Sequence, residues 1–170
     1  DSILEKALMS KTIIDAIKPQ NIKQYNNIWN TREYLSQAQK INGPSIKHDI
    51  SIPIKKISYF LKEVELRLPK IPKKNLLAFG HLADGNLHFN VSKPTDVSDS
   101  NFKKLKTYVN KTIFDLVYDL GGSFSAEHGI GKNKINEFKK YSSNEEFMLK
   151  KKLKKLIDPN NIMNPGKIFK

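Results

Sequence analysis

The chain of 170 residues is long enough for one domain with a real core, but too short for a complete cofactor-binding domain and a complete substrate domain together. It has no cysteine, which excludes disulfides, cysteine-ligated zinc, iron–sulfur clusters and thiol catalysis. Its formal net charge is +13, and no apolar run reaches the roughly 18 residues that would span a membrane.

The positive charge comes almost entirely from lysine, because Arg32 and Arg67 are the only arginines among 30 basic residues. Proteins that read nucleic-acid sequence rely on arginine for bidentate contacts. We therefore expect a mostly solvated basic surface, part of which steers an anionic substrate, and no nucleic-acid partner. A basic RNA-binding module is the alternative from another functional class.

Hydrophobic periodicity and turn residues divide the chain into helical and extended stretches. The elements expected in chain order are helices at 3–18 and 21–40, a strand at 46–52, a helix at 54–68, strands at 75–81 and 86–91, a helix from a Ser98 cap to Gly121, a strand at 122–126, and helices at 132–140 and 144–157.

From residue 46 to 126 the order is β-α-β-β-α-β, which is that of the ferredoxin-like split βαβ plan. We predict an α+β fold with a four-stranded antiparallel sheet and two helices on one face. N-terminal helices (1–45) and a C-terminal helical segment (131–170) would flank it within a single domain, 1–170. Since the chain opens on Asp1 rather than Met, we expect a piece of a longer protein.

Asp84-Gly85 between two β-prone runs predicts a hairpin with a two-residue turn. In that register His81 lies opposite His88 on one face, with Cβ atoms about 4.5–5.5 Å apart, so both imidazoles could bind one metal ion. Asn90 shares this face. The other face would carry the core residues Leu82, Leu87 and Phe89. Two surface histidines on a hairpin are the alternative interpretation.

A second group of polar residues lies at the end of the strand expected at 122–126, where Glu127-His128 precede Gly129 and Gly131. Glycines there let a backbone approach a ligand closely. Glu127 could complete a two-histidine, one-carboxylate set that suits zinc, iron(II) or manganese(II). Alternatively, Glu127 is an acidic residue at a helix N-terminus, where acids are favoured.

A third candidate group is Arg32 and Ser36, which share a helix face at i, i+4, followed by Lys47. Arginine is suited to bidentate binding of a carboxylate. Spacing alone favours the alternative, an ion pair on the helix surface. The sequence contains no dinucleotide-binding G-x-G-x-x-G after a strand, no Walker A loop and no H-E-x-x-H. It also lacks the basic-Gly-aromatic pattern of RNA-recognition motifs.

Three segments together resemble the C-terminal substrate domain of FAD-linked oxidases of the vanillyl-alcohol oxidase type. These are 80–91 (GHLADGNLHFNV), 122–131 (GSFSAEHGIG) and 158–167 (DPNNIMNPGK), in the family's order. The resemblance is strongest to D-2-hydroxyglutarate dehydrogenase, D-lactate dehydrogenase and the FAD subunit of glycolate oxidase. Ala83 departs from the family's usual glycine.

The resemblance implies FAD-dependent oxidation of a D-2-hydroxy acid, and it assigns roles residue by residue. A divalent metal, zinc or manganese, is implied at His81, His88 and Glu127, with His128 as the base. Substrate contacts are implied for Arg32, Ser36, Lys47 and Asn90, and proximity to the flavin for Asn164 and Lys167.

The family's FAD-binding domain is absent from the 170 residues, so we expect it in the same or a separate chain. Without the FAD-binding domain the chain should not turn over substrate. Because a metal and Asn90 suffice for the 2-hydroxy-carboxylate end, the surplus Arg32, Ser36 and Lys47 favour a dicarboxylate, D-2-hydroxyglutarate, over D-lactate or glycolate. A folded but inactive fragment is a further alternative. We expect a cytoplasmic protein, or one peripheral on the inner face of a membrane.

Overall fold

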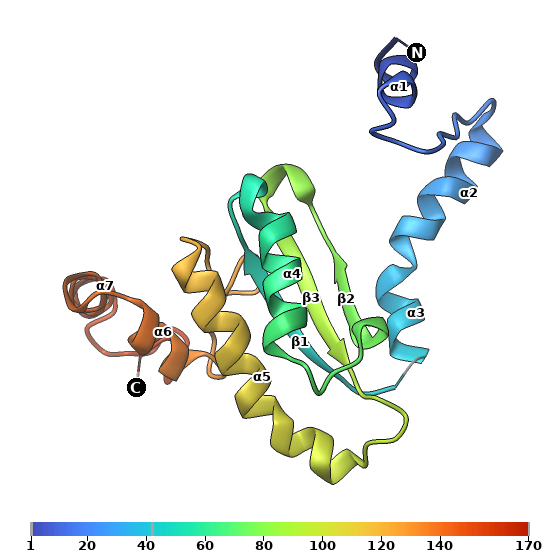
Figure 1. The fold of residues 1–170 in the computed structure, drawn as a ribbon. Helices are drawn as coiled ribbons and strands as arrows, with labels where there is room; N and C mark the ends of the chain where they lie inside the picture. The colour runs from blue at the N-terminus through green and yellow to red at the C-terminus, as the bar shows by residue number, and fades with distance from the viewer. Residues whose placement is uncertain (1, 42, 170) are drawn as a thin grey trace. The chain divides into compact units, whose positions relative to one another are not determined.

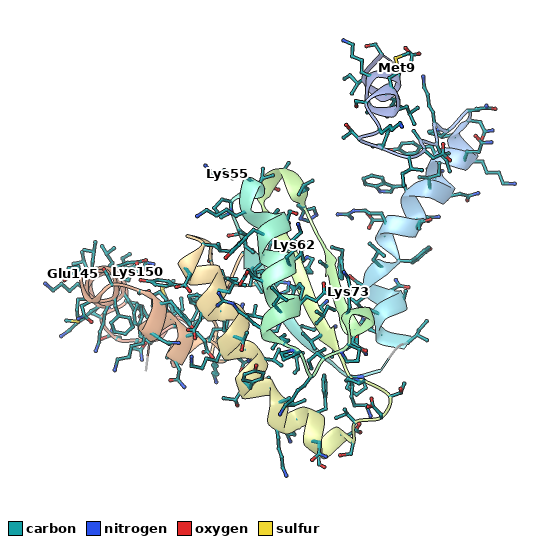
Figure 2. All side chains as sticks on the ribbon, in the orientation of Figure 1. Met9, Lys55, Lys62, Lys73, Glu145 and Lys150 are labelled. Carbon is teal, nitrogen blue, oxygen red and sulfur yellow. The ribbon has the colours of Figure 1, made fainter. Side chains whose placement is uncertain are left out.

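A computed structural model describes residues 2–41 and 43–169, which fall into two compact units, 1–43 and 44–170. Figure 1 shows the elements of both units in chain order. None of the helices formed by these residues combines the length and apolarity needed to cross a bilayer. Lysine side chains project from the surface of the second unit, as the exposed Lys55, Lys62 and Lys73 illustrate (Figure 2).

The first unit contains three helices, α1 (Ser2–Met9), α2 (Ile22–Glu33) and α3 (Leu35–Ile41). The prediction of one helix over 3–18 is wrong beyond Met9, where Lys11 takes a positive φ of 55°. Helix α2 begins where the Asn21 side chain accepts the Gln24 N–H. The helix expected over 21–40 is interrupted at Tyr34, so one continuous helix does not carry both Arg32 and Ser36.

The second unit is built on an antiparallel sheet with strand order β1-β3-β2. Its strands are β1 (Ser45–Ser51), β2 (Leu76–Phe79) and β3 (Asn86–Ser92). Its α-helices are α4 (Ile57–Arg67), α5 (Asp99–Asp119), α6 (Ile135–Tyr141) and α7 (Asn144–Ile157). Single 3₁₀ turns lie at Ile54–Lys56, Lys73–Asn75 and Leu82–Asp84. The predicted α+β class is confirmed.

Both α4 and α5 cover the same face of the sheet (Figure 1). The Phe60 ring of α4 lies 5.4 Å from the Phe89 ring of β3, and the Phe114 ring of α5 lies 5.3 Å from the His48 ring of β1. The face that meets these helices carries the alternate residues Ile46, His48, Ile50, Leu87, Phe89 and Val91, all buried. The polar residues between them therefore occupy the opposite face.

The fourth strand expected at 122–126 is not formed; a single antiparallel bridge joins Ser123 to Ser51. Two backbone hydrogen bonds of 2.9 and 2.8 Å make this bridge. The Ser123 hydroxyl then donates to the Ser125 carbonyl, which turns the chain out of an extended path. The segment still runs along the outer edge of β1, which is where the split βαβ plan places its fourth strand.

The predicted hairpin register is wrong. Strand β2 ends at Phe79, which pairs with His88, so His81 does not lie opposite His88. Residues 80–85 form a longer loop with a 3₁₀ turn, and Leu82 is 63% exposed rather than part of the core. Leu87 and Phe89 are buried as predicted. A two-residue type I′ turn needs a positive φ at both turn positions, and of Asp84 and Gly85 only the glycine has one, 66°.

Gly85 and Gly122 bring two loops against the end of β1. A Cβ on Gly85 would lie 2.2 Å from the Ile52 carbonyl oxygen, and one on Gly122 would lie 2.2 Å from that of Ser51. The Ile52 N–H also donates to the Gly85 carbonyl at 2.9 Å. Both loops that carry the predicted site residues thus depend on backbone contacts that only glycine permits.

Candidate metal and substrate site

The polar face of the sheet brings candidate residues from β1 and β3 together. The register pairs Lys47 with Asn90, and the next pair on the same face is Asp49 with His88. Asn90 is 3% exposed, whereas the side chain of Lys47 reaches solvent. Two of the predicted substrate-binding residues therefore lie on neighbouring strands beside a predicted metal ligand.

The carboxylate of Glu127 lies between the two predicted histidine ligands. Its Oε1 lies 2.9 Å from His81 Nδ1, and its Oε2 lies 3.8 Å from His88 Nε2. The Asn86 side-chain amide also donates to Oε1. The three side chains that the sequence analysis grouped are thus close together, although His81 reaches the group from the loop 80–85 and not from a strand.

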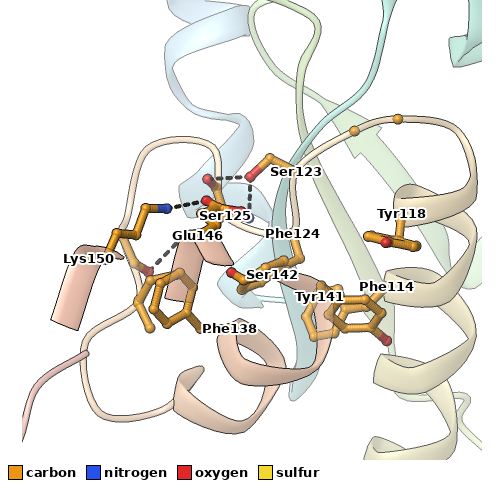
Figure 3. Close-up of a pocket in the computed structure, with 14 residues that line it drawn as sticks. Phe114, Tyr118, Ser123, Phe124, Ser125, Phe138, Tyr141, Ser142, Glu146 and Lys150 are labelled. Atoms are coloured by element: carbon orange, nitrogen blue, oxygen red, sulfur yellow. Dashed lines mark hydrogen bonds and ion pairs between the residues drawn. The ribbon is translucent and has the colours of Figure 1, made fainter. Parts of the chain in front are cut away.

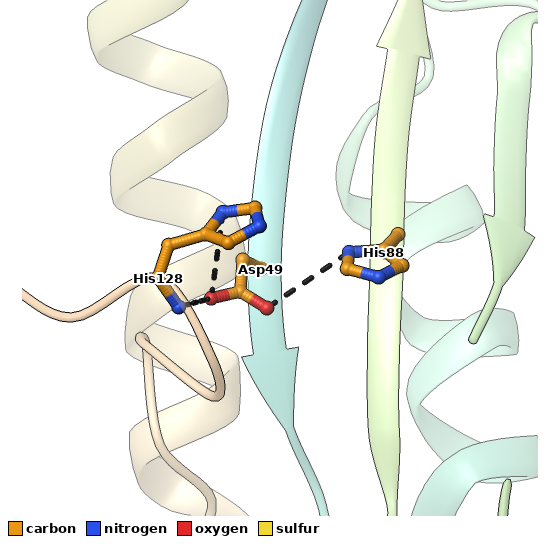
Figure 4. Close-up of side chains that lie close together, drawn as sticks. All are labelled: Asp49, His88 and His128. Carbon is orange, nitrogen blue, oxygen red and sulfur yellow. Dashed lines mark hydrogen bonds and ion pairs between the residues drawn. The ribbon is translucent and has the colours of Figure 1, made fainter. Parts of the chain in front are cut away.

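Asp49 lies behind this group and is almost completely buried, at 4% exposure. Its Oδ2 accepts the backbone N–H groups of Glu127 and His128 at 2.9 and 2.8 Å. Its Oδ1 lies 3.9 Å from His88 Nδ1 (Figure 4). Burial raises the pKa of the Asp49 carboxyl, but the two backbone N–H groups and nearby positive charge outweigh it and hold this pKa below its ordinary value.

His128 projects from the same turn and is exposed to solvent. Its ring stacks on that of His88 with centroids 5.8 Å apart, and its Nδ1 lies 3.7 Å from Asp49 Oδ2. Among the described residues, Asp49, His88 and His128 offer ligand atoms within 4.8 Å of one another. This second possible ligand set shares His88 with the first.

The segment that carries Glu127 and His128 is held from its other side by Lys134. The half-buried Lys134 ammonium donates to the Phe124 carbonyl and to the Ser125 hydroxyl, each at 3.1 Å. Desolvation lowers the pKa of Lys134, while the negative charges of Asp49 and Glu137 oppose this shift. Ser125 in turn donates to the Gly129 carbonyl at 2.8 Å.

A cavity of about 510 Å³ lies beside residues 121–125, among α5, α6 and α7 (Figure 3). Aromatic side chains form much of its wall, including Phe114, Phe124, Phe138 and Tyr141. None of the predicted site residues lines it. The cavity is therefore separate from the group around Glu127.

The C-terminal turn with Asn164 and Lys167 is tied to the same glycine-rich segment. The Lys167 ammonium lies 3.3 Å from the Asn164 side-chain oxygen, and both residues are exposed. The Ile168 N–H donates to the Gly131 carbonyl at 2.9 Å. Upstream, the Asp158 carboxylate accepts the N–H groups of Ile162 and Met163. These hydrogen bonds give a structural role to the acidic residue at the start of the motif 158–167.

Arg32 and Ser36 belong to the first unit, whereas the other predicted site residues belong to the second. The Arg32 guanidinium lies 2.6 Å from the Glu33 carboxylate and 5.5 Å from the centre of the Trp29 ring. Ser36 lies in the first turn of α3. The roles of both residues toward substrate remain predictions.

Comparison with known proteins identifies the family of this chain. Residues 2–168 match the C-terminal domain of FAD-linked oxidases. The chain belongs to this family. It is 39% identical over 158 residues to D-2-hydroxyglutarate dehydrogenase of Stutzerimonas stutzeri (strain A1501), covering 92% of the chain and 34% of that relative.

The mitochondrial D-2-hydroxyglutarate dehydrogenases of Arabidopsis thaliana and Danio rerio are 33% and 30% identical to the chain, over 169 and 164 residues. These matches cover 99% and 96% of the chain, and 29% and 30% of the relatives. The chain therefore spans about a third of the length of these dehydrogenases. The resemblance inferred from the three sequence segments is confirmed.

Two residues of this FAD-linked oxidase domain escaped the sequence analysis, Asp49 and Asn86. In the strand expected at 46–52, Asp49 alternates with apolar residues and therefore shares a face with Lys47, which is the one signal that the sequence offers for it. Its contacts are with backbone N–H groups of a segment 78 and 79 residues away, and residue spacing does not encode such contacts. Asn86 was assigned to the strand alone, without a role toward Glu127.

Proposed function

We propose that the chain is the substrate- and metal-binding part of an FAD-dependent dehydrogenase that oxidises a D-2-hydroxy acid to the 2-oxo acid. D-2-hydroxyglutarate is the favoured substrate. The observation that carries the proposal is the position of Glu127, one oxygen facing His81 and the other facing His88, beside Asn90 and Lys47 on the sheet. The names of the relatives support the substrate class.

The donor set fits a divalent metal ion. Two imidazoles and one carboxylate suit zinc or manganese and leave coordination positions open for substrate. The buried Asp49 carboxylate lies behind this donor set and adds negative charge that favours a bound cation. When bound, such an ion lowers the pKa of a coordinated hydroxyl. His81, His88 and Glu127 would hold it.

His128 is the proposed general base. Because its Nδ1 faces the Asp49 carboxylate, Nε2 is the nitrogen that takes the proton of the substrate 2-hydroxyl. The C2 hydrogen leaves with its electron pair, so the products are the 2-oxo acid, a proton on His128 and a reduced acceptor. Flavin is the acceptor chemistry that the family's other domain supplies, and Asn164 and Lys167 are proposed to lie beside it.

We propose that specificity for a dicarboxylate comes from basic side chains in excess of those needed to bind a single carboxylate. Asn90 binds the 2-hydroxy-carboxylate end, and Lys47 on the neighbouring strand binds the distal carboxylate, with Arg32 and Ser36 assigned by the family resemblance alone. We treat 1–170 as one functional domain whose partner is an FAD-binding domain in the same or a separate chain. The expected compartment is cytoplasmic or peripheral to a membrane, although several relatives carry "mitochondrial" in their names.

Metal content tests the proposal directly. The purified chain, loaded with zinc or manganese and dialysed, should hold about one ion, and His81→Ala and His88→Ala should hold far less. Asp96→Asn, which removes an exposed carboxylate from a loop outside the site, is the matched control and should bind as the parent does. Equal metal content in the parent and both histidine variants would contradict the proposed site.

A further inference from the structure

The His88 ring lies between two carboxylates. Its Nδ1 lies 3.9 Å from Asp49 Oδ1, and its Nε2 lies 3.8 Å from Glu127 Oε2. An imidazole that binds a metal through one nitrogen usually donates the N–H of the other to a carboxylate or carbonyl, which fixes the tautomer and the ring orientation. On the Nδ1 side of His88, Asp49 is in position to be that carboxylate.

The two oxygens of Asp49 have different surroundings. Oδ2 accepts the backbone N–H groups of Glu127 and His128, whereas Oδ1 is buried and without a hydrogen bond among the described residues. A buried carboxylate oxygen without a hydrogen-bond partner is unfavourable, because it has lost its hydration and gained nothing in return. Closing the gap to His88 Nδ1 by about 1 Å would satisfy this oxygen with an N–H donor.

We propose that Asp49 is a positioning residue of the metal site. Through Oδ1 it holds His88 in the tautomer with hydrogen on Nδ1, so that the lone pair of Nε2 faces the Glu127 side. Through Oδ2 it fixes the turn that carries Glu127 and His128. The inference deepens the proposed function and rests on it for the identity of the metal ligands.

A different arrangement would make Asp49 a metal ligand together with His88 and His128, whose ligand atoms also lie close together. Burial and the two backbone hydrogen bonds on Asp49 favour the positioning role. The two arrangements require opposite tautomers of His88. Positioning by Asp49 needs hydrogen on Nδ1, whereas ligation from the Asp49 side needs a bare Nδ1 and hydrogen on Nε2.

Asp49→Asn separates these roles with little change of shape. The single oxygen of the introduced amide can keep the two backbone N–H groups, which leaves the amide NH₂ group facing His88 Nδ1. Nδ1 must then accept a hydrogen bond, so the hydrogen moves to Nε2, and that nitrogen can no longer bind a metal. We expect zinc affinity to fall about 10–100-fold while the thermal unfolding midpoint changes little.

Two measurements on the full chain test the inference. Long-range ¹⁵N–¹H NMR spectra of the metal-free parent should show His88 with hydrogen on Nδ1, and those of Asp49→Asn with hydrogen on Nε2. Competition titrations with a zinc-binding dye should rank the parent and Asp96→Asn together, Asp49→Asn about 10–100-fold weaker, and His88→Ala weakest. The NMR measurement on the parent tests the inference even if a variant fails to fold.

Hydrogen on Nε2 of His88 in the parent would overturn the positioning role. Equal zinc affinity of the parent and Asp49→Asn, with binding lost in His88→Ala, would also overturn it while leaving the proposed function intact. A parent that binds no zinc or manganese would instead contradict the proposed metal site, and the inference that depends on it would fall too.

Discussion

His128, the proposed general base, is exposed to solvent on the turn that also carries Glu127. Once the chain is combined with its FAD-binding domain, His128→Ala should lower turnover of D-2-hydroxyglutarate about 10²–10⁴-fold, the usual effect of losing a general base. Steady-state assays with an artificial electron acceptor would measure this. Metal content should stay at the parent level. Turnover within a few-fold of the parent would show that another group removes the proton.

The proposed specificity for a dicarboxylate substrate can be tested at Lys47. Lys47→Met should reduce kcat/KM for D-2-hydroxyglutarate about tenfold or more relative to D-lactate, because a charged hydrogen bond contributes about 1.5–3 kcal/mol. Lys55→Met, at an exposed lysine away from the polar face of the sheet, is the matched control. A parent that already prefers lactate, or an equal fall for both substrates, would contradict the assignment.

At the scale of single residues, the sequence predicted which side chains lie close together but not the backbone path that brings them there. His81, His88 and Glu127 do lie together, yet the two-residue turn that led to this grouping is wrong. Gly85 takes a positive φ and packs closely against the Ile52 carbonyl, a tertiary contact that residue preference at Asp84-Gly85 does not encode. Asp49 could not be found from spacing, because its hydrogen-bond partners are main-chain groups.

Two elements with strong hydrophobic periodicity were predicted close to their observed bounds. The strand expected at 46–52 spans Ser45–Ser51, and the helix at 144–157 has the expected bounds. The helix expected at 3–18 ends at Met9, because Lys11 takes a positive φ of 55° and the Thr12 N–H donates to the Ala7 carbonyl, a pattern that closes a helix C-terminus.

The strand expected at 122–126 was predicted less accurately, because most contacts of this segment are not those of a strand. Ser123 makes one bridge to β1 and the Ala126 N–H donates to the Asp49 carbonyl, after which the Glu127 and His128 N–H groups bond to the Asp49 carboxylate. A side chain on the neighbouring strand thus ends the strand early. Periodicity cannot predict this, because it considers only whether residues point inward or outward.

The stability of the second unit should depend on a buried neutral histidine. His48 is 2% exposed, its Nδ1 donates to the Phe89 carbonyl at 2.9 Å, and its Nε2 meets the Asn110 side chain at 3.0 Å. Burial lowers the pKa of His48 from 6.5 to about 4. Between these values the unfolded chain binds a proton that the folded chain does not, so stability falls as the pH is lowered.

The loss should approach about 3 kcal/mol as pH falls from about 6.5 to about 4, with no further contribution from His48 below that. Urea unfolding across this pH range would measure it. His48→Gln should flatten the dependence in this window, whereas the carboxyl groups of Asp49 and Asp115, whose pKa values lie below 3.8, act at lower pH. Equal slopes for the parent and the variant would contradict the prediction.

The bridge between Ser123 and Ser51 has a consequence for how the molecule behaves in a crowded solution. An outer strand with unpaired N–H and C=O groups invites strands of other chains to add to the sheet. Along β1 those groups are engaged by the passing segment, through Ser123 on Ser51 and the Ala126 N–H on the Asp49 carbonyl. The segment that carries Glu127 and His128 therefore also shields this edge, so damage that releases it would promote self-association as well as remove the site.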